Sequence, residues 1–267
     1  MITHDLSFLD KPEIIQYIFY PRKQSRELQN SDNTFTILLE ISSEIKISCR
    51  FYRTLDYKFA PTILLFHGNG EIAADYDFIG PMYQKLGINL LVADYRGYGL
   101  SSGTPSFTTM IADSHAIYQQ VRNYLLTNIY IGPVSIMGRS LGSASAIEIS
   151  IHYQSQIHSL IIESGFAYTY ALLKRLGIPN YLLPIKYEDR VSPLSQIKEV
   201  KIPALVIHGE QDNIIPIKDG KALFQALSSV DKKLLLIPNA GHNDLLLVGP
   251  REYMNAIKSR VMDRDYV

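Results

Sequence analysis

The chain has 267 residues, of which 46% are hydrophobic, and its 26 basic residues balance 26 acidic ones. A chain of this length is near the upper limit for one hydrophobic core, so we expect a single α/β domain with a modest insertion at most. The balanced charge excludes a global electrostatic field for nucleic acid or anionic lipid, and we expect no polyanionic partner.

Cysteine use and the N-terminal residues bear on the compartment. Cys49 is the only cysteine, which excludes an intramolecular disulfide or a cysteine-based metal cluster and favours a reducing compartment. Residues 1–19 contain Asp5, Asp10 and Lys11 among apolar residues, so they do not form the uninterrupted apolar run of a secretory signal. No run approaches the roughly 20 apolar residues of a membrane span. We expect a soluble, cytoplasmic protein without stable membrane insertion, in an oligomeric state that the sequence does not indicate.

Regular structure is predicted only after the first 34 residues, to which we assign no role. Two strands, Phe35 to Ile41 and Ile45 to Phe51, are separated by three polar residues and predict a hairpin. Six short apolar runs then alternate with helix-length stretches, which is typical of a mostly parallel sheet with helices on both faces. The runs are Ile63 to Phe66, Asn89 to Ala93, Val134 to Met137, Leu160 to Ile162, Leu205 to Ile207 and Leu234 to Ile237. We predict one domain over residues 35–267.

The sequence also predicts two helices and one irregular segment. Phe107 to Leu126 carries apolar residues at three- and four-residue spacings behind Ser106 as N-cap, and a similar pattern runs from Tyr253 to Val261. Residues 165–192 are rich in leucine and tyrosine but are interrupted by glycine and proline. We interpret them as a short lid over the carboxyl edge of the sheet, with an ordinary core-packed helix at Tyr168 to Leu176 as an equal alternative.

The pentapeptide Gly138 to Gly142 places Ser140 between an apolar strand and an alanine-rich helix. This context fits a nucleophilic serine on a strained strand-to-helix turn, where side chains in place of the two glycines would crowd the neighbouring backbone. A turn or capping serine is the alternative for the motif on its own.

A serine nucleophile needs a neutral imidazole beside it and a carboxylate to orient that imidazole. His242 and Asp212 each follow an apolar run, and the order Ser, Asp, His is that of nucleophile-elbow hydrolases. Glu163 also ends a strand and is the alternative acid. An oxyanion would need two backbone N–H donors, for which we choose Leu141 and Asn69, with Gly70 next.

Together these motifs resemble the α/β-hydrolase superfamily of serine hydrolases. The resemblance covers roughly residues 60–260 and is especially close to the small-lidded branch with serine-peptidase-like and depalmitoylase-like members. It implies Ser140 as nucleophile, His242 as base, Asp212 as acid, and Asn69 and Leu141 as oxyanion donors. The motifs are His67 to Gly70, Asp94 to Gly99 with Ser101 to Gly103, Gly138 to Ser143, Gly209 to Asp212, and Gly241 to Asp244.

Cofactors are not indicated. Gly97 to Gly103 is glycine-rich and follows a strand, but Thr104 and Pro105 separate it from the next helix, so no helix start is placed for a pyrophosphate. The seven histidines show no H-E-x-x-H or similar spacing, so we expect no catalytic metal.

The sequence therefore predicts a serine hydrolase, carboxylesterase- or thioesterase-like, that cleaves an ester or thioester through an acyl-enzyme without a cofactor. The apolar lid suggests a small-molecule or acyl substrate whose acyl group is hydrophobic and of short to medium length. An aminopeptidase, a lactonase or a C–C bond hydrolase could use the same residues. A non-catalytic binding module that keeps the elbow is the alternative from another class.

Overall fold

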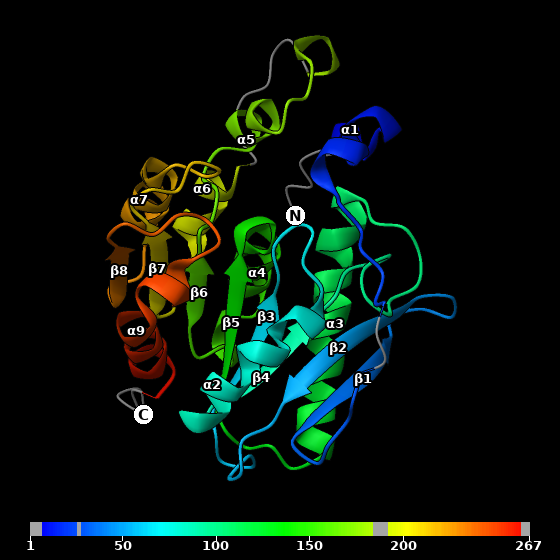
Figure 1. The fold of residues 1–267 in the computed structure, drawn as a ribbon, viewed down its shortest axis with the longest axis vertical. Coiled ribbons are helices and arrows are strands. Elements are labelled where there is room, and N and C mark those ends of the chain that lie inside the picture. The colour runs from blue at the N-terminus through cyan, green and yellow to red at the C-terminus, as the bar shows by residue number, and fades with distance from the viewer. Residues whose placement is uncertain (1–6, 26–27, 184–191, 263–267) are drawn as a thin grey trace.

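The protein is built on one twisted β-sheet, seen in a computed structural model that describes residues 7–25, 28–183 and 192–262 (Figure 1). Its eight strands follow the order β1-β2-β4-β3-β5-β6-β7-β8. Strand β2 is antiparallel to β1 and β4, and every other neighbouring pair is parallel. The strands are β1 (Thr34–Glu40), β2 (Lys46–Tyr52), β3 (Thr62–Phe66), β4 (Asn89–Ala93), β5 (Val134–Arg139), β6 (Leu160–Glu163), β7 (Ala204–Gly209) and β8 (Lys232–Ile237).

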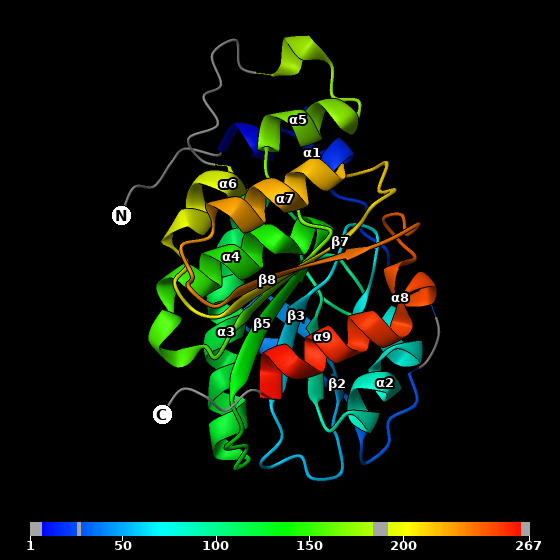
Figure 2. The same cartoon turned by 90° about the vertical axis from the view of Figure 1, so that its left-hand side faces the viewer.

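Helices cover both faces of the sheet, with α3, α4 and α7 on one face and α2, α8 and α9 on the other (Figure 2). The α-helices are α1 (Pro12–Ile18), α2 (Gly80–Lys85), α3 (Phe107–Thr127), α4 (Ser143–His152), α5 (Thr169–Arg175), α6 (Pro193–Gln196), α7 (Ile217–Ala226), α8 (Leu245–Val248) and α9 (Pro250–Met262). Short 3-10 helices are η1 (Ser7–Asp10), η2 (Ala73–Phe78), η3 (Ser140–Gly142), η4 (Gln154–Gln156), η5 (Asn180–Leu182) and η7 (Ile197–Glu199). None of the helices in the described part of the chain combines the length and apolarity that a bilayer crossing requires.

The strands bury side chains on both faces because successive residues point to opposite sides. In β3, Leu64 and Phe66 join the core under α3 and α4, whereas Ile63 and Leu65 join the core under α9. This two-sided burial explains why the central strands are continuous apolar runs without alternation.

The predicted fold class is confirmed, including the N-terminal antiparallel hairpin and the six later strands. The predicted helix from Phe107 is α3, and Ser106 caps it, since its Oγ accepts a hydrogen bond from the Thr109 N–H at 3.2 Å. Strand β5 is longer than predicted and includes Gly138 and Arg139. These additional residues bring the strand directly to Ser140.

The carboxyl ends of the parallel strands meet at one edge of the sheet, and α1 and α5 lie beyond this edge (Figure 1). The loops that follow β3, β5, β7 and β8 therefore converge there. Helix α5 and η5 fall within the predicted lid of residues 165–192, whereas residues 184–191 of that segment lie outside the described residues.

The N-terminal segment, residues 7–20, packs into the main core, although sequence analysis assigned it no role. Leu9 of η1 and Ile14 and Ile18 of α1 are buried, and η1 contacts α3. Ile14 and Ile18 are four residues apart, so they share one face of the short helix. The buried apolar residues of η1 and α1 thus serve tertiary packing.

We expect Ile14→Ala to lower the free energy of unfolding by about 2–5 kcal/mol, because it removes a fully buried side chain from the core. Urea unfolding followed by circular dichroism measures the change. The exposed neighbour Glu13 provides the matched control, and Glu13→Ala should stay within about 0.5 kcal/mol of the parent. Equal stability of the two variants would show that α1 does not share the cooperative unfolding of the core.

Candidate active site

Ser140 stands on a sharp turn between β5 and α4. Its φ of +50° lies in the left-handed region that a residue with a side chain rarely adopts. The turn is held by close packing, since a Cβ at Gly142 would overlap the carbonyl oxygen of Phe66 and one at Gly138 would lie 2.5 Å from the Gly142 carbonyl oxygen. The Ser143 hydroxyl also donates to the Ser140 carbonyl oxygen at 2.6 Å. The two glycines therefore allow the strained position that presents the serine.

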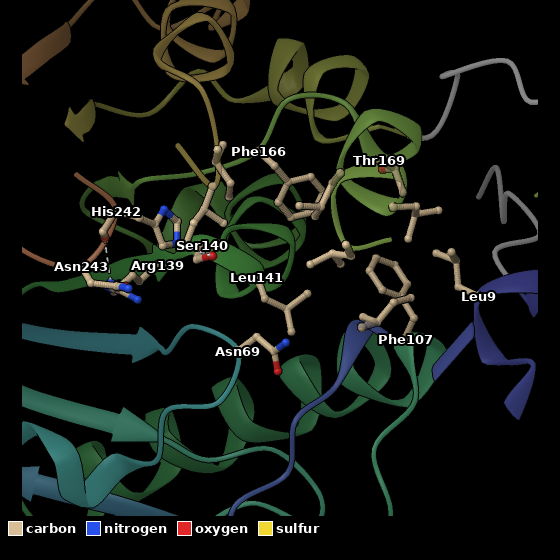
Figure 3. A pocket seen from close by; sticks show the side chains of 16 residues that line it. Leu9, Asn69, Phe107, Arg139, Ser140, Leu141, Phe166, Thr169, His242 and Asn243 are labelled. Carbon is tan, nitrogen blue, oxygen red and sulfur yellow. Dashed lines mark hydrogen bonds between the residues drawn. The ribbon is translucent and has the colours of Figure 1, made fainter. Parts of the chain in front are cut away.

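The structure brings Ser140, His242 and Asp212 into one hydrogen-bonded chain. His242 Nε2 lies 3.0 Å from Ser140 Oγ (Figure 3). On the other side of the ring, His242 Nδ1 lies 2.7 Å from Asp212 Oδ2. The serine follows β5, the aspartate follows β7 and the histidine follows β8. Three loops far apart in sequence meet because their strands end at the same edge.

Asp212 is held as an ionised acceptor. Its Oδ1 accepts hydrogen bonds from the N–H groups of Ile214 at 2.9 Å and Ile215 at 2.8 Å. Burial tends to raise the pKa of this carboxyl, but the hydrogen bond and charge interaction with His242 outweigh burial and leave the pKa below its ordinary value. A carboxylate at Nδ1 favours the tautomer with the proton on Nδ1, which leaves Nε2 as an acceptor facing the serine.

Glu163, the alternative acid, has different partners. Its Oε1 lies 3.1 Å from Arg139 Nε, and its Oε2 accepts a hydrogen bond from the Tyr253 hydroxyl at 2.6 Å. Both carboxylate oxygens are thus engaged away from His242. The geometry pairs the histidine with Asp212.

Arg139, which the sequence reasoning did not single out, joins the loops around the site. Besides Glu163, its guanidinium is paired with Glu71, and its Nη2 donates to the His242 carbonyl oxygen at 3.0 Å and to Asn243 Oδ1 at 2.9 Å. Burial would lower the pKa of Arg139, but the two carboxylates raise it, so the side chain remains charged. A charged residue at the end of an otherwise apolar strand was the available signal in the sequence.

The predicted oxyanion residues lie beside the serine. Asn69 and Leu141 line the same cavity as Ser140. Asn69 Oδ1 accepts hydrogen bonds from the Tyr20 N–H and the Tyr98 hydroxyl, both at 2.8 Å. These bonds anchor the loop after β3 to the N-terminal segment.

A cavity of about 250 Å³ extends from the serine toward the N-terminal segment. Figure 3 shows Ser140 and His242 at one end and Leu9 at the other, with Phe166 between them. Most of the lining side chains are apolar and come from η1, α1, α3, η3, α5 with its C-cap residue, and the loops after β6 and β7. They are Leu9, Ile18, Phe107, Leu141, Phe166, Leu172, Leu173, Leu176, Ile214 and Ile215. The sequence predicted Ser140 and His242 as site residues, but it did not indicate that Leu9 and Ile18 form part of the cavity wall.

A family model described as serine aminopeptidase, S33, matches residues 58–178 and 192–246. The chain belongs to this family of α/β-hydrolases. The match includes the loops of Ser140, Asp212 and His242 and omits the N-terminal segment.

Two relatives and one solved structure are similar to this α/β-hydrolase. It is 30% identical over 192 residues to protein bem46 of Schizosaccharomyces pombe, covering 70% of this chain and 63% of that protein, which is less than two thirds of its length. It is 30% identical over 226 residues to human alpha/beta hydrolase domain-containing protein 17B, covering 81% of this chain and 71% of that protein. The Pyrococcus furiosus esterase Pf2001 has the same fold, with a TM-score of 0.70 and 18% identity over 90% of this chain and 98% of that chain.

We expect Gly142→Ala to lower stability by about 1–3 kcal/mol or more, because the new methyl group meets backbone atoms that cannot move aside. Gly241→Ala is the matched control, since a Cβ there would come no closer than 3.5 Å to any neighbour. Thermal unfolding of both variants checks this expectation. If Gly142→Ala were as stable as Gly241→Ala, the close packing of the turn would be contradicted.

Proposed function

We propose that the protein is a serine hydrolase that cleaves a carboxylic ester or thioester through an acyl-enzyme intermediate. The observation that carries the proposal is the hydrogen-bonded chain from Asp212 through His242 to Ser140, at one end of an apolar cavity. Such a chain generates a nucleophile at neutral pH, and a neighbouring cavity selects what it attacks.

In the acylation step, Ser140 Oγ attacks the substrate carbonyl carbon while His242 Nε2 takes the hydroxyl proton. Asp212 stabilises the imidazolium that forms and remains ionised itself. The backbone N–H groups of Leu141 and Asn69, with Gly70 as the alternative to Asn69, receive the oxyanion. Leu141 lies in the first turn leading into α4, where the helix end favours negative charge.

In the second half of the reaction the same groups act in reverse. His242 gives its proton to the departing alcohol or thiol, and the acyl group remains as an ester of Ser140. His242 then takes a proton from water as the water oxygen attacks the acyl carbon. It gives that proton to Ser140 Oγ when the bond between the acyl carbon and Oγ breaks, which releases the acid and restores the enzyme. No cofactor is required for these steps.

The cavity supports a hydrophobic acyl group of short to medium length. Its walls are leucine, isoleucine and phenylalanine side chains, and each methylene that they bury contributes about 0.8 kcal/mol. Helix α5 supplies Leu172 and Leu173 to this wall and its C-cap residue is Leu176, which also lines it; this supports the interpretation of residues 165–192 as a lid on a single domain. The N-terminal segment closes the far end with Leu9 and Ile18.

An aminopeptidase is the second candidate, because the matching family carries that description. A free substrate amine needs an unengaged carboxylate near the serine. Asp212 and Glu163 are both occupied, by His242 and by Arg139 with Tyr253. The apolar cavity favours the esterase proposal, and a panel of aminoacyl p-nitroanilides beside p-nitrophenyl esters separates the two.

We expect Asp212→Asn to lower kcat by about 10³–10⁴, because the amide no longer favours the productive histidine tautomer. Glu163→Gln should cause a much smaller loss, since that side chain contacts Arg139 and Tyr253 rather than His242. Steady-state kinetics on an activated ester compare the two variants. A large kcat loss in Glu163→Gln alone would contradict the assignment of the acid.

A fluorophosphonate probe tests whether the protein is an enzyme or a binding module. The parent protein should be labelled, and Ser140→Ala should not. Folded protein that resists labelling would support the binding module.

We expect p-nitrophenyl esters to be hydrolysed with a preference for medium over very short chains, and Leu9→Phe to reduce kcat/KM for the longer esters. Each methylene that no longer fits costs up to about fourfold, while the acetate ester should be unaffected. Leu55→Phe, at a highly exposed position, is the control. An unchanged chain-length profile in Leu9→Phe, or no hydrolysis at any length, would count against an acyl group in this cavity.

A further inference from the structure

Two histidines and a glutamate converge between α3 and α4, away from the serine. His115 comes from α3, whereas Glu148 and His152 lie one turn apart on α4. His115 Nε2 lies 3.1 Å and His152 Nδ1 lies 3.2 Å from the same oxygen, Glu148 Oε1. One potential ligand atom from each side chain lies within 4.8 Å of the others.

We propose that His115, Glu148 and His152 form a binding site for Zn²⁺ or a similar divalent transition metal ion, which clamps α3 to α4. Two imidazoles and one carboxylate are a ligand set that zinc accepts, with a fourth position left to water. Because the reacting chain already accounts for the hydrolysis, the metal site is structural and independent of that proposal.

The separation of the ligand atoms supports a metal. Zinc binds nitrogen and carboxylate oxygen at about 2.0–2.2 Å, so two such ligands in a tetrahedron lie a little over 3 Å apart. The contacts of 3.1 and 3.2 Å to Glu148 Oε1 are already close to that spacing. The ring centroids of His115 and His152 lie 4.9 Å apart, so the two rings need only a small movement to place one nitrogen each on a shared ion.

The surroundings of the cluster resemble those of a metal site. The other ring nitrogen of His115, Nδ1, lies 3.2 Å from the Tyr153 hydroxyl, which can either donate or accept. When Nε2 binds the ion, the ring proton moves to Nδ1 and is donated to that hydroxyl. Gln196 Nε2 donates to the second carboxylate oxygen of Glu148 at 3.4 Å. The contacts with Tyr153 and Gln196 therefore orient the side chains of His115 and Glu148.

Access to the cluster also favours a cation. The His152 side chain is 46% exposed, which gives an ion a route from solvent. His152 is twelve residues beyond Ser140, or about 18 Å along a helix rising 1.5 Å per residue, so the ion would not touch the reacting groups.

Spacing in the sequence could not reveal this site. Glu148 and His152 provide an i, i+4 pair, but the third ligand comes from a different helix, 33 residues earlier. The expectation that no catalytic metal is present concerned the reaction, and it is compatible with a structural ion.

Isothermal titration calorimetry of the full chain with Zn²⁺ alone, after dialysis against a chelator, tests the proposal. We expect the parent protein to bind one equivalent of Zn²⁺ tightly. His115→Asn or His152→Asn should lower the zinc affinity by at least about 10–100-fold, which is the loss typical of removing even a residue that only supports a ligand. The Tm of the parent should rise by about 5 °C when free Zn²⁺ reaches 100 times Kd. At the same free Zn²⁺ concentration, each ligand variant should show no more than about half of this rise.

Two further variants keep the test specific. His242→Asn removes the histidine of the reacting chain and should retain the tight equivalent, which excludes zinc held by His242 and Asp212. Glu148→Gln keeps a hydrogen-bond acceptor but loses the charge, so its zinc affinity should fall while its Tm without zinc stays near that of the parent. No tight equivalent in the parent, or one that disappears only in His242→Asn, would overturn the proposal.

Discussion

The arrangement of the site depends on one buried guanidinium. Arg139 joins Glu71 in the loop after β3, Glu163 at the end of β6, and the carbonyl oxygen of His242 after β8. A planar group with five donors can satisfy acceptors in several directions at once, which an ammonium cannot do as well. Because a buried charge is tolerated only when it is fully paired, the three loops are constrained together. The residue next to Ser140 therefore also fixes the loop of His242.

Close packing at the turn has the same effect on Ser140 itself. The serine keeps an unfavourable φ because the turn is closely packed: α4 leaves room only for glycine at position 138, and the end of β3 leaves room only for glycine at position 142. The surrounding core, with strands buried on both faces, provides the rigidity that holds such strain. Hydrophobic burial thus supports a local conformation that the turn would not adopt alone.

The hydrogen-bonded side chains of Ser140, His242 and Asp212 and the walls of the cavity come from different parts of the chain. The former lie in loops at one edge of the sheet, whereas the cavity is completed by η1, α1 and α5. Family resemblance covers the first set, and the matched residues begin only at 58, after the N-terminal wall. Different residues of this fold can therefore determine the reaction and the choice of substrate, as is common for folds that support many substrates. Leu9 and Ile18 lie outside the residues that the family model matches, whereas α5 lies within them.

The sequence by itself determined the hairpin, the six later strands, the capped helix at Ser106 and the order of Ser140, Asp212 and His242, because these follow from local periodicity and from turns between neighbours. It left Asp212 and Glu163 as alternatives, since both follow strands. Only the tertiary structure decided which carboxylate faces His242, what Arg139 holds, where residues 7–20 pack and that His115 meets Glu148. The physical reason is that such contacts join side chains far apart in the chain, and their distances depend on strand order, helix packing and burial, which no local pattern records.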